Sequence, residues 1–259
     1  LLVWVGSFWG TGGMIVAGVL GVIMNFGTWF FSDRIAVTAM RGQEIDANSA
    51  PQLFEIVERL SKRAELPMPR VYICPQEAPN AFATGRNPKH SAVAVTQGAM
   101  RLLNQRELEG VIAHELAHIK NRDTLTSTIA ATVAGIFSML AYMVMLFPIG
   151  GERGGNPLAM LGMVLLGALG AALIKAMISR SREFVADADG AKIAGSPDGL
   201  ASALRSLEGY AKRIPMQNPN PAMNNMFIVE PFSGQSITKL FASHPPTEDR
   251  IKALMSQKG

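Results

Sequence analysis

The sequence is poor in cysteine and in charged residues. One cysteine, Cys74, stands among 259 residues, which excludes an internal disulfide and any metal cluster built on several thiolates. Charged residues make up 17% of the chain and hydrophobic residues 48%, a balance too apolar for an ordinary soluble domain. The net charge of +4 is scattered, without a basic run interleaved with aromatic residues. This distribution argues against nucleic acid as a partner.

The chain also lacks the features of a cleaved leader peptide. It opens with the apolar residues LLVWV, without an initiator methionine and without a basic stretch before them. We therefore expect the sequence to begin inside a hydrophobic segment, with a membrane span upstream of it. No internal repeat is visible in the rest of the chain.

Three long uncharged segments predict membrane helices. Residues 13–31 form a run of nineteen residues without a charge, enough to cross a bilayer core of about 30 Å. The small residues of this run stand at helical spacing, at Gly13, Ala17 and Gly21. Such a row lets another helix approach closely. Residues 125–147 and 157–174 are also uncharged, and together they predict a hairpin that enters and leaves the membrane on the same side.

Basic residues set the expected orientation of these helices. The turn between the two hairpin segments carries one basic residue, Arg153. The opposite ends of the spans carry Lys120, Arg122, Lys175, Arg180 and Arg182, and Arg34 and Arg41 follow the first span. By the positive-inside rule we expect a multi-pass protein of the cell (inner or plasma) membrane whose remaining parts face the cytoplasm.

The segments outside the apolar runs predict short helices and strands. Residues 51–64 have the spacing of an amphipathic helix, and residues 70–74, 78–85 and 91–96 have the composition of short strands. The strand at 91–96 consists of small residues and stands just before the next helix. It either lends its edge to an extended peptide or is simply part of the sheet, and the sequence leaves both possibilities open.

One helix carries the residues with the clearest chemistry. Asn104 and Glu107 have the spacing of a capping box, and apolar residues then recur at helical intervals. His114 and His118 are four residues apart and therefore share one face of this helix, where neutral imidazoles can bind Zn²⁺ and leave a position for water. Glu115 follows the first histidine and can take a proton from that water, as in H-E-x-x-H metallopeptidases.

The expected hairpin indicates a third metal ligand. Because it returns to the side it left, the residues that follow it come back to the neighbourhood of His118. Glu183 is the first acidic residue there, and a carboxylate completes a catalytic His₂Glu zinc site. Asp187 follows one helical turn later and could orient a zinc-binding histidine through its other ring nitrogen. The alternative for both residues is a solvated acidic helix face.

Four motifs of the chain resemble those of the HtpX-type membrane zinc metalloproteases, which are related more distantly to the Ste24 CAAX prenyl proteases. The motifs are PNAFATG at 79–85, VIAHELAH at 111–118, REFVAD at 182–187, and HPP at 244–246 with Arg250. They occur in the family's order, on both sides of the hairpin, and the resemblance covers nearly the whole chain from Gly13 onward. It departs from the family at the start, where the first membrane helix is expected to be truncated.

The resemblance implies roles for individual residues. It implies one zinc ion per chain, bound by His114, His118 and Glu183. Glu115 would act as general base and acid, and Asn80 would contact the substrate backbone or the metal-bound water. His244 would stand near the developing oxyanion, with Arg250 supporting it. His90 matches no family position and is expected to be an exposed loop residue.

The resemblance also implies the overall fold. We expect an integral membrane protein of the α+β class, mainly helical, with transmembrane helices and a cytoplasmic gluzincin-like zinc protease domain that contains a small β-sheet. The expected parts are an N-terminal membrane segment (1–31), a protease part (32–124), a transmembrane hairpin (125–178) and a second protease part (179–259).

The implied function is that of a membrane-bound zinc metalloendopeptidase in stress response and quality control. Its expected substrates are membrane proteins or unfolded polypeptides, cleaved at the cytoplasmic face of the bilayer; the oligomeric state is unknown. A metzincin is excluded because Asn121 and Thr124 stand where its glycine and third histidine would follow. A site-2 intramembrane protease is disfavoured because polar residues follow His118 at once. A prenyl-protein protease, and a non-catalytic membrane scaffold with a structural metal site, remain as alternatives.

Overall fold

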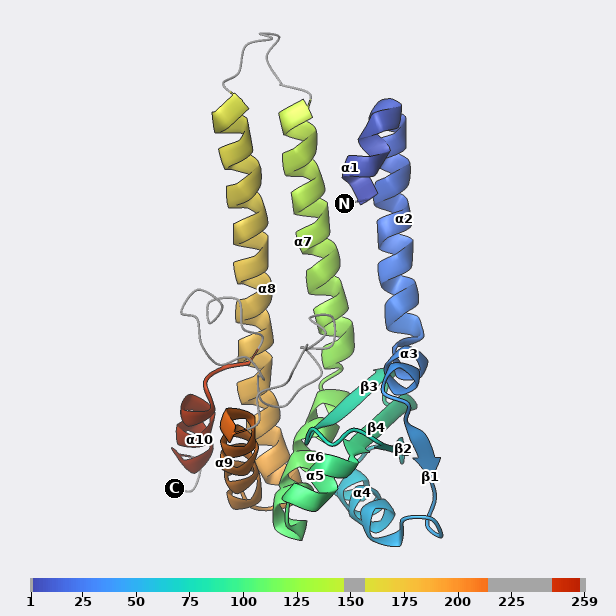
Figure 1. Ribbon diagram of the computed structural model, residues 1–259, viewed down its shortest axis with the longest axis vertical. Helices are drawn as coiled ribbons and strands as arrows, with labels where there is room; N and C mark the ends of the chain where they lie inside the picture. The colour runs from blue at the N-terminus through green and yellow to red at the C-terminus, as the bar shows by residue number, and fades with distance from the viewer. Residues whose placement is uncertain (1, 147–156, 214–243, 257–259) are drawn as a thin grey trace.

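The protein consists of three long helices that stand side by side and a mixed sheet, covered by shorter helices, at one end of them (Figure 1). The computed structural model describes residues 2–146, 157–213 and 244–256. The glycine-rich turn expected at 150–156, with its arginine, lies outside the described residues. The expectation of a mainly helical chain with a small sheet is confirmed.

The long helices are α2 (Gly10–Phe30), α7 (Asp123–Leu146) and α8 (Pro157–Ala194). Each coincides with one of the uncharged segments that predicted a helix. α8 has 38 residues, which corresponds to about 57 Å at 1.5 Å per residue. The expected boundary between the hairpin and the second protease part therefore falls inside one continuous helix, which leads from the apolar segment to Glu183 and Asp187.

The small residues of α2 are covered by the first helix of the chain. α1 (Leu2–Gly6) turns back onto α2 through a 3₁₀ turn (Ser7–Trp9). A Cβ added to Gly13 would lie 2.2 Å from the carbonyl oxygen of Gly6, and one added to Gly6 would lie 2.7 Å from the Cβ of Ala17. The predicted close approach of a second helix is therefore confirmed at these positions.

Four short strands form the sheet in the order β1-β2-β4-β3. They are β1 (Gln43–Ile45), β2 (Arg70–Cys74), β3 (Ala81–Asn87) and β4 (His90–Thr96). β2 and β4 run parallel, whereas the two outer pairs are antiparallel. Because β4 has a partner on each side, the structure decides between the two possibilities left open for residues 91–96: they are an inner strand of the sheet and offer no free edge to a peptide. β3 is the outer strand on that side.

The remaining helices pack around the sheet and around α8 (Figure 1). They are α3 (Ser32–Ala39), α4 (Pro51–Arg63), α5 (Gln97–Leu102), α6 (Gln105–Lys120), α9 (Asp198–Arg213) and α10 (Thr247–Met255). The predicted amphipathic helix is confirmed as α4, which buries Leu53, Val57 and Leu60 in the core. α6 lies at the centre of this part, against the sheet, α8 and α9.

The start of α6 is held by the predicted capping box. Asn104 Oδ1 accepts a hydrogen bond from the backbone N–H of Glu107 (3.1 Å), and Glu107 Oε2 accepts one from the backbone N–H of Asn104 (3.0 Å). Glu107 Oε1 also accepts hydrogen bonds from Ser202 Oγ (2.6 Å) and Ser206 Oγ (3.0 Å) on α9. The buried carboxylate of Glu107 therefore takes part in the cap of α6 and also holds α9 against that helix.

A glycine lets α6 and α9 approach each other closely. A Cβ added to Gly110 would lie 2.4 Å from the backbone nitrogen of Leu200, and neither backbone can yield without moving its helix. Gly209, on α9, has nothing within 4 Å of the place where its Cβ would be. The two glycines therefore differ in packing although both lie in helices.

We predict that Gly110→Ala lowers the free energy of unfolding by about 1–3 kcal/mol, because the added methyl group forces two packed backbones apart. The control Gly209→Ala should raise it by up to about 1 kcal/mol, since alanine is the better helix former at an open position. Thermal unfolding of both purified variants in detergent measures the difference. Equal melting temperatures would contradict the packing at Gly110.

Candidate active site

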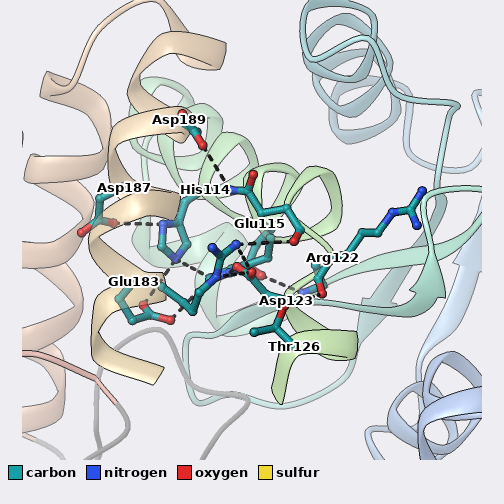
Figure 2. A network of polar contacts seen from close by, with 12 residues as sticks. His114, Glu115, Arg122, Asp123, Thr126, Glu183, Asp187 and Asp189 are labelled. Atoms are coloured by element: carbon teal, nitrogen blue, oxygen red, sulfur yellow. Dashed lines mark hydrogen bonds and ion pairs between the residues drawn. The ribbon is translucent and has the colours of Figure 1, made fainter. Parts of the chain in front are cut away.

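Two helices supply the central residues of the site. They are His114, Glu115 and His118 on α6, with Glu183 and Asp187 on α8 (Figure 2). The approach of α8 depends on Gly190, because a Cβ there would lie 2.9 Å from the Cα of His114. The hairpin argument is thus confirmed in its geometry: the residues after the apolar segment do return to the two histidines.

Three of these side chains stand at the separations that one metal ion requires. The Nε2 atoms of His114 and His118 are 3.1 Å apart. The carboxylate oxygens of Glu183 lie 3.6 Å from Nε2 of His114 and 3.5 Å from Nε2 of His118. A tetrahedral zinc ion with bonds of about 2.0–2.1 Å holds its ligand atoms about 3.4 Å apart. The donor set therefore fits a single ion.

Each imidazole faces a carboxylate on the side away from the other ring. Nδ1 of His114 lies 2.9 Å from Asp187 Oδ1, and Nδ1 of His118 lies 2.7 Å from Asp123 Oδ2. Because an ionised carboxylate only accepts, it favours the proton on the Nδ1 that it faces, which leaves Nε2 as the nitrogen that a neutral ring offers to a metal ion. The two Nε2 atoms face each other across 3.1 Å. A metal ion between them would relieve the repulsion of two neutral rings in this arrangement.

The charges around the histidines also favour a divalent cation. The site contains the carboxylates of Glu115, Asp123, Glu183 and Asp187 and the guanidinium groups of Arg182 and Arg250. With neutral imidazoles, four carboxylates and two guanidinium groups leave a net charge of −2 on these residues. Buried charge of one sign is costly, and a divalent cation would balance it.

The ionisation of the ligands follows from the same surroundings. Burial by itself lowers the pKa of His118, but the hydrogen bond to Asp123 and the nearby carboxylates outweigh it and raise that pKa to about 9. Burial opposes the charge of Glu183, but its interactions with His244, His118 and Arg250 hold its pKa well below its usual range. The site therefore attracts positive charge to the histidines and offers an ionised carboxylate to a metal ion.

Glu115 lies beside the three candidate ligands and is held by a residue of the sheet. Its Oε2 accepts a hydrogen bond of 2.7 Å from the backbone N–H of Ala83 on β3. Burial raises the pKa of Glu115 above its usual value. A carboxyl group with a raised pKa is better suited to take and return a proton near neutral pH. The outer strand of the sheet thus fixes the residue predicted to act as general base.

The residues predicted near the C-terminus lie against α8. Nδ1 of His244 is 3.0 Å from Glu183 Oε2. Arg250 is 1% exposed and donates to Asp187 through Nη2 (2.7 Å) and Nε (2.8 Å), while its Nη1 lies 3.4 Å from Glu183 Oε2. Burial opposes the charge of Asp187, but these bonds lower its pKa to about 2. The contact of His244 with an oxyanion stays a prediction.

The structure also places Asn80 and His90, the two remaining residues for which the sequence analysis made a prediction. Asn80 is 1% exposed and directly precedes β3; its backbone N–H donates to Thr96 Oγ1 (2.8 Å) and its carbonyl accepts from the backbone N–H of Thr96 (2.9 Å). Its contact with substrate or water stays a prediction. His90 is exposed as expected, but it begins β4 rather than lying in a loop.

Two polar residues of the site were not predicted from the sequence. Asp123 contacts Nδ1 of His118, and Arg182 donates to Asp123 through both Nε and Nη2. The reasoning that assigned Asp187 to one histidine applies equally to the other, and it calls for a second carboxylate close to His118. That requirement is the signal that would have indicated Asp123, five residues further along the chain.

Comparison with known proteins agrees with this geometry. The pattern described as Peptidase family M48 matches residues 47–258. The chain is 53% identical over 252 residues to a "Protease HtpX homolog" of Desulfatibacillum aliphaticivorans, covering 95% of this chain and 81% of that relative. It is 49% identical over 256 residues to a protein of the same name from Pelotomaculum thermopropionicum, covering 96% of this chain and 91% of the relative.

A solved structure shares the fold. The crystal structure of S. mikatae Ste24p superposes with a TM-score of 0.61 over 98% of this chain, at 17% sequence identity. This chain covers 60% of that longer protein. At this level of identity the match concerns the arrangement of the backbone.

The chain belongs to peptidase family M48 and is therefore a metallopeptidase. Of the helices whose residues the structure describes, one, spanning Ser7–Phe30, is long and apolar enough to cross a membrane. The chain is thus a membrane metalloprotease, similar over most of its length to proteins named as HtpX homologs.

The buried Arg250–Asp187 pair provides a test of how the site is built. We predict that Arg250→Met lowers the free energy of unfolding by about 3–5 kcal/mol, because it leaves the carboxylate of Asp187 buried without its partner. The control Lys62→Met removes a solvent-exposed ion pair with Glu58 and should change it by less than about 1 kcal/mol.

Chemical denaturation in detergent, with a chelator present so that metal binding does not contribute, measures both values. Similar midpoints for the two variants would contradict the structural importance of the buried pair.

Proposed function

We propose that the chain is a zinc endopeptidase that is held in the membrane by α2, α7 and α8 and cleaves membrane proteins or unfolded polypeptides at the cytoplasmic face. The observation that carries this proposal is the convergence of the Nε2 atoms of His114 and His118 with the carboxylate of Glu183, while Glu115 lies next to, but not among, the three donors. A structural metal site has no use for a buried carboxylate in that position.

The residues of the chain divide the chemistry between them. His114, His118 and Glu183 would hold the ion, and zinc, when bound, supplies a Lewis acid that polarises the scissile carbonyl and makes water more acidic. Glu115 takes the proton from the attacking water and passes it to the leaving amine. The hydrogen bond from Ala83 keeps the Glu115 carboxylate in place during both transfers.

The outer strand β3 is suited to bind an extended peptide. It pairs with β4 on one side, and on the other side the backbone N–H of Ala83 reaches Glu115. Thr124 Oγ1 donates to the carbonyl of Gly85 (2.6 Å), which ties the same strand to the first turn of α7. These two backbone groups already have partners, so a peptide added along β3 would bind to the strand's other backbone groups, and its scissile bond would then lie beside Glu115.

The surface of α2 supports a position in the bilayer. Most of the apolar surface of the helical segment Ser7–Phe30 is not covered by the rest of the protein, whereas it would be covered in the core of a soluble domain. Aromatic side chains are exposed at both ends: Phe8 (71%) and Trp9 (74%) at one, Phe30 (45%) and Phe31 (48%) at the other. Trp9 is of the kind that gathers at membrane–water interfaces, and the exposed phenylalanines add apolar surface that lipid can cover.

The packing of α7 against α2 supports the same position for the hairpin. Asn25 Nδ2 donates to Thr132 Oγ1 (2.6 Å), a polar contact between two otherwise apolar helices. Polar side chains inside a bilayer find partners in this way because lipid offers none. α8 lies along the other side of α7, so α2, α7 and α8 form a unit of three helices (Figure 1).

The orientation and the substrate class follow from the sequence and the resemblance. Basic residues gather at the ends of the spans next to the protease part, which favours the cytoplasm for the site. A catalytic site directly below membrane helices favours substrates that are themselves in or near the membrane. The role in quality control of damaged membrane proteins rests on the resemblance of the sequence motifs to the HtpX-type proteases.

The central prediction concerns Glu115. In detergent, the parent protein should bind one zinc ion and cleave casein and itself, whereas Glu115→Gln should bind zinc equally well and lose at least about 100-fold in cleavage rate, because the general base is lost. Zinc content and the appearance of peptide fragments measure the two effects separately.

Glu109→Gln is the matched control, since Glu109 lies on the same helix and pairs with Arg59 away from the ligands. It should retain both zinc and activity. Zinc bound without cleavage by the parent would support the scaffold alternative, and a parent without zinc would contradict the proposal.

The orientation can be tested by labelling single cysteines. In a Cys74→Ser background expressed in a bacterial inner membrane, Thr11→Cys at the start of α2 should react with an impermeant maleimide in intact spheroplasts. Lys62→Cys, exposed on the protease part, should react only after the membrane is opened. The reverse pattern would place the site outside the cytoplasm.

A further inference from the structure

Each of the two metal-binding histidines is backed by a carboxylate, and each carboxylate by an arginine. On one side Nδ1 of His114 contacts Asp187, which binds Arg250. On the other side Nδ1 of His118 contacts Asp123 Oδ2 at 2.7 Å, and Asp123 Oδ1 accepts from Arg182.

The second set of contacts, His118–Asp123–Arg182, lies where three helices meet. Asp123 is the first residue of α7, placed there by Arg122, whose positive φ of 53° turns the backbone from α6 into α7. Arg182 lies on α8, one residue before Glu183, and its Nη2 also donates to the carbonyl of Asn121 (3.4 Å). These contacts therefore join the end of α6 and the start of α7 to α8, next to the metal ligands.

The two histidines depend on their carboxylates to different degrees. The side chain of His114 is 2% exposed and is enclosed by α8, whereas that of His118 is 20% exposed. A partly exposed imidazole can rotate and change tautomer more easily, because water can replace its partners. The carboxylate of Asp123 is thus the main restraint on the orientation of His118 among the described residues.

We propose that Asp123 and Arg182 are positioning residues that raise the metal affinity of the site by fixing His118. Asp123 holds the proton on Nδ1 and so keeps the lone pair of Nε2 directed at the ion. Arg182 acts through Asp123: it binds Oδ1 and leaves Oδ2 for the histidine. The inference rests on the proposed function, since it needs a metal at His118.

The test uses the full chain in detergent, in the Glu115→Gln background so that self-cleavage does not interfere. Competition with a chromophoric zinc chelator gives the dissociation constant. Asp123→Asn should weaken zinc binding by about 10- to 100-fold, the usual cost of losing a carboxylate behind a histidine ligand. Arg182→Gln should weaken it less, and Arg182→Lys, which keeps the charge, should lie near the parent.

The double variant separates positioning from a general structural role. If Arg182 acts through Asp123, combining Asp123→Asn with Arg182→Gln weakens zinc binding no more than Asp123→Asn alone. If the pair were purely structural, the substitutions would lower the melting temperature and leave the zinc affinity of the folded protein unchanged. Their effects on the melting temperature would then add in the double variant. That result would overturn the inference.

Asp33→Asn is the matched control. Asp33 is a similarly buried carboxylate (8% exposed side chain, against 10% for Asp123), it pairs with Arg70, and it also lies beside the end of a long helix. It should leave the zinc affinity unchanged. If the parent binds no zinc, the proposed function fails and this inference with it; if the parent binds zinc and Asp123→Asn binds it equally well, this inference alone fails.

Discussion

The site depends on holding two imidazole Nε2 atoms toward each other. The Nε2 atoms of His114 and His118 are 3.1 Å apart, and each Nδ1 faces a carboxylate from a different part of the chain. The helical spacing of four residues brings the rings to one face, but it does not orient them. The carboxylates of Asp187 and Asp123 favour the orientation in which both Nε2 atoms point at one ion.

Other elements of the fold position the residues of this site. α8 runs without interruption from its uncharged first half to Glu183 and Asp187, so one continuous helix joins the long-helix part of the molecule to the site. Glycine at 190 lets α8 pass against the backbone of His114, and β3 holds Glu115 through the N–H of Ala83. The sheet, the long helices and the metal ligands are therefore mechanically connected, which is consistent with a protease that acts at the membrane surface.

The parts of the fold that local patterns specify could be predicted. The capping box of Asn104 and Glu107, the H-E-x-x-H spacing and the amphipathic helix at 51–63 are short-range signals, and the structure has each of them. Glu183 was reached by a topological argument, because a hairpin must return to its starting side. Its approach to the histidines bears this out, while its role as a ligand remains a prediction.

Features that depend on tertiary contacts could not be predicted in this way. β1 has three residues, too few for an alternating pattern, and the order of strands that makes β4 internal is set by long-range pairing. Arg122 takes a positive φ that glycine or asparagine usually marks, so the turn that places Asp123 behind His118 had no sequence signal. The bond from Arg250 to Asp187 joins residues 63 positions apart.

The most direct test of the central claim is zinc K-edge X-ray absorption on the Glu115→Gln variant loaded with one equivalent of zinc. Of the four histidines in the chain, the account places two on the metal. It therefore predicts a first shell of nitrogen and oxygen atoms at about 2.0–2.1 Å with the scattering of two imidazoles. A third imidazole would bring His244 or His90 into the ligand set, and a sulfur ligand would require Cys74 or a methionine. Either result would contradict the site built from His114, His118 and Glu183.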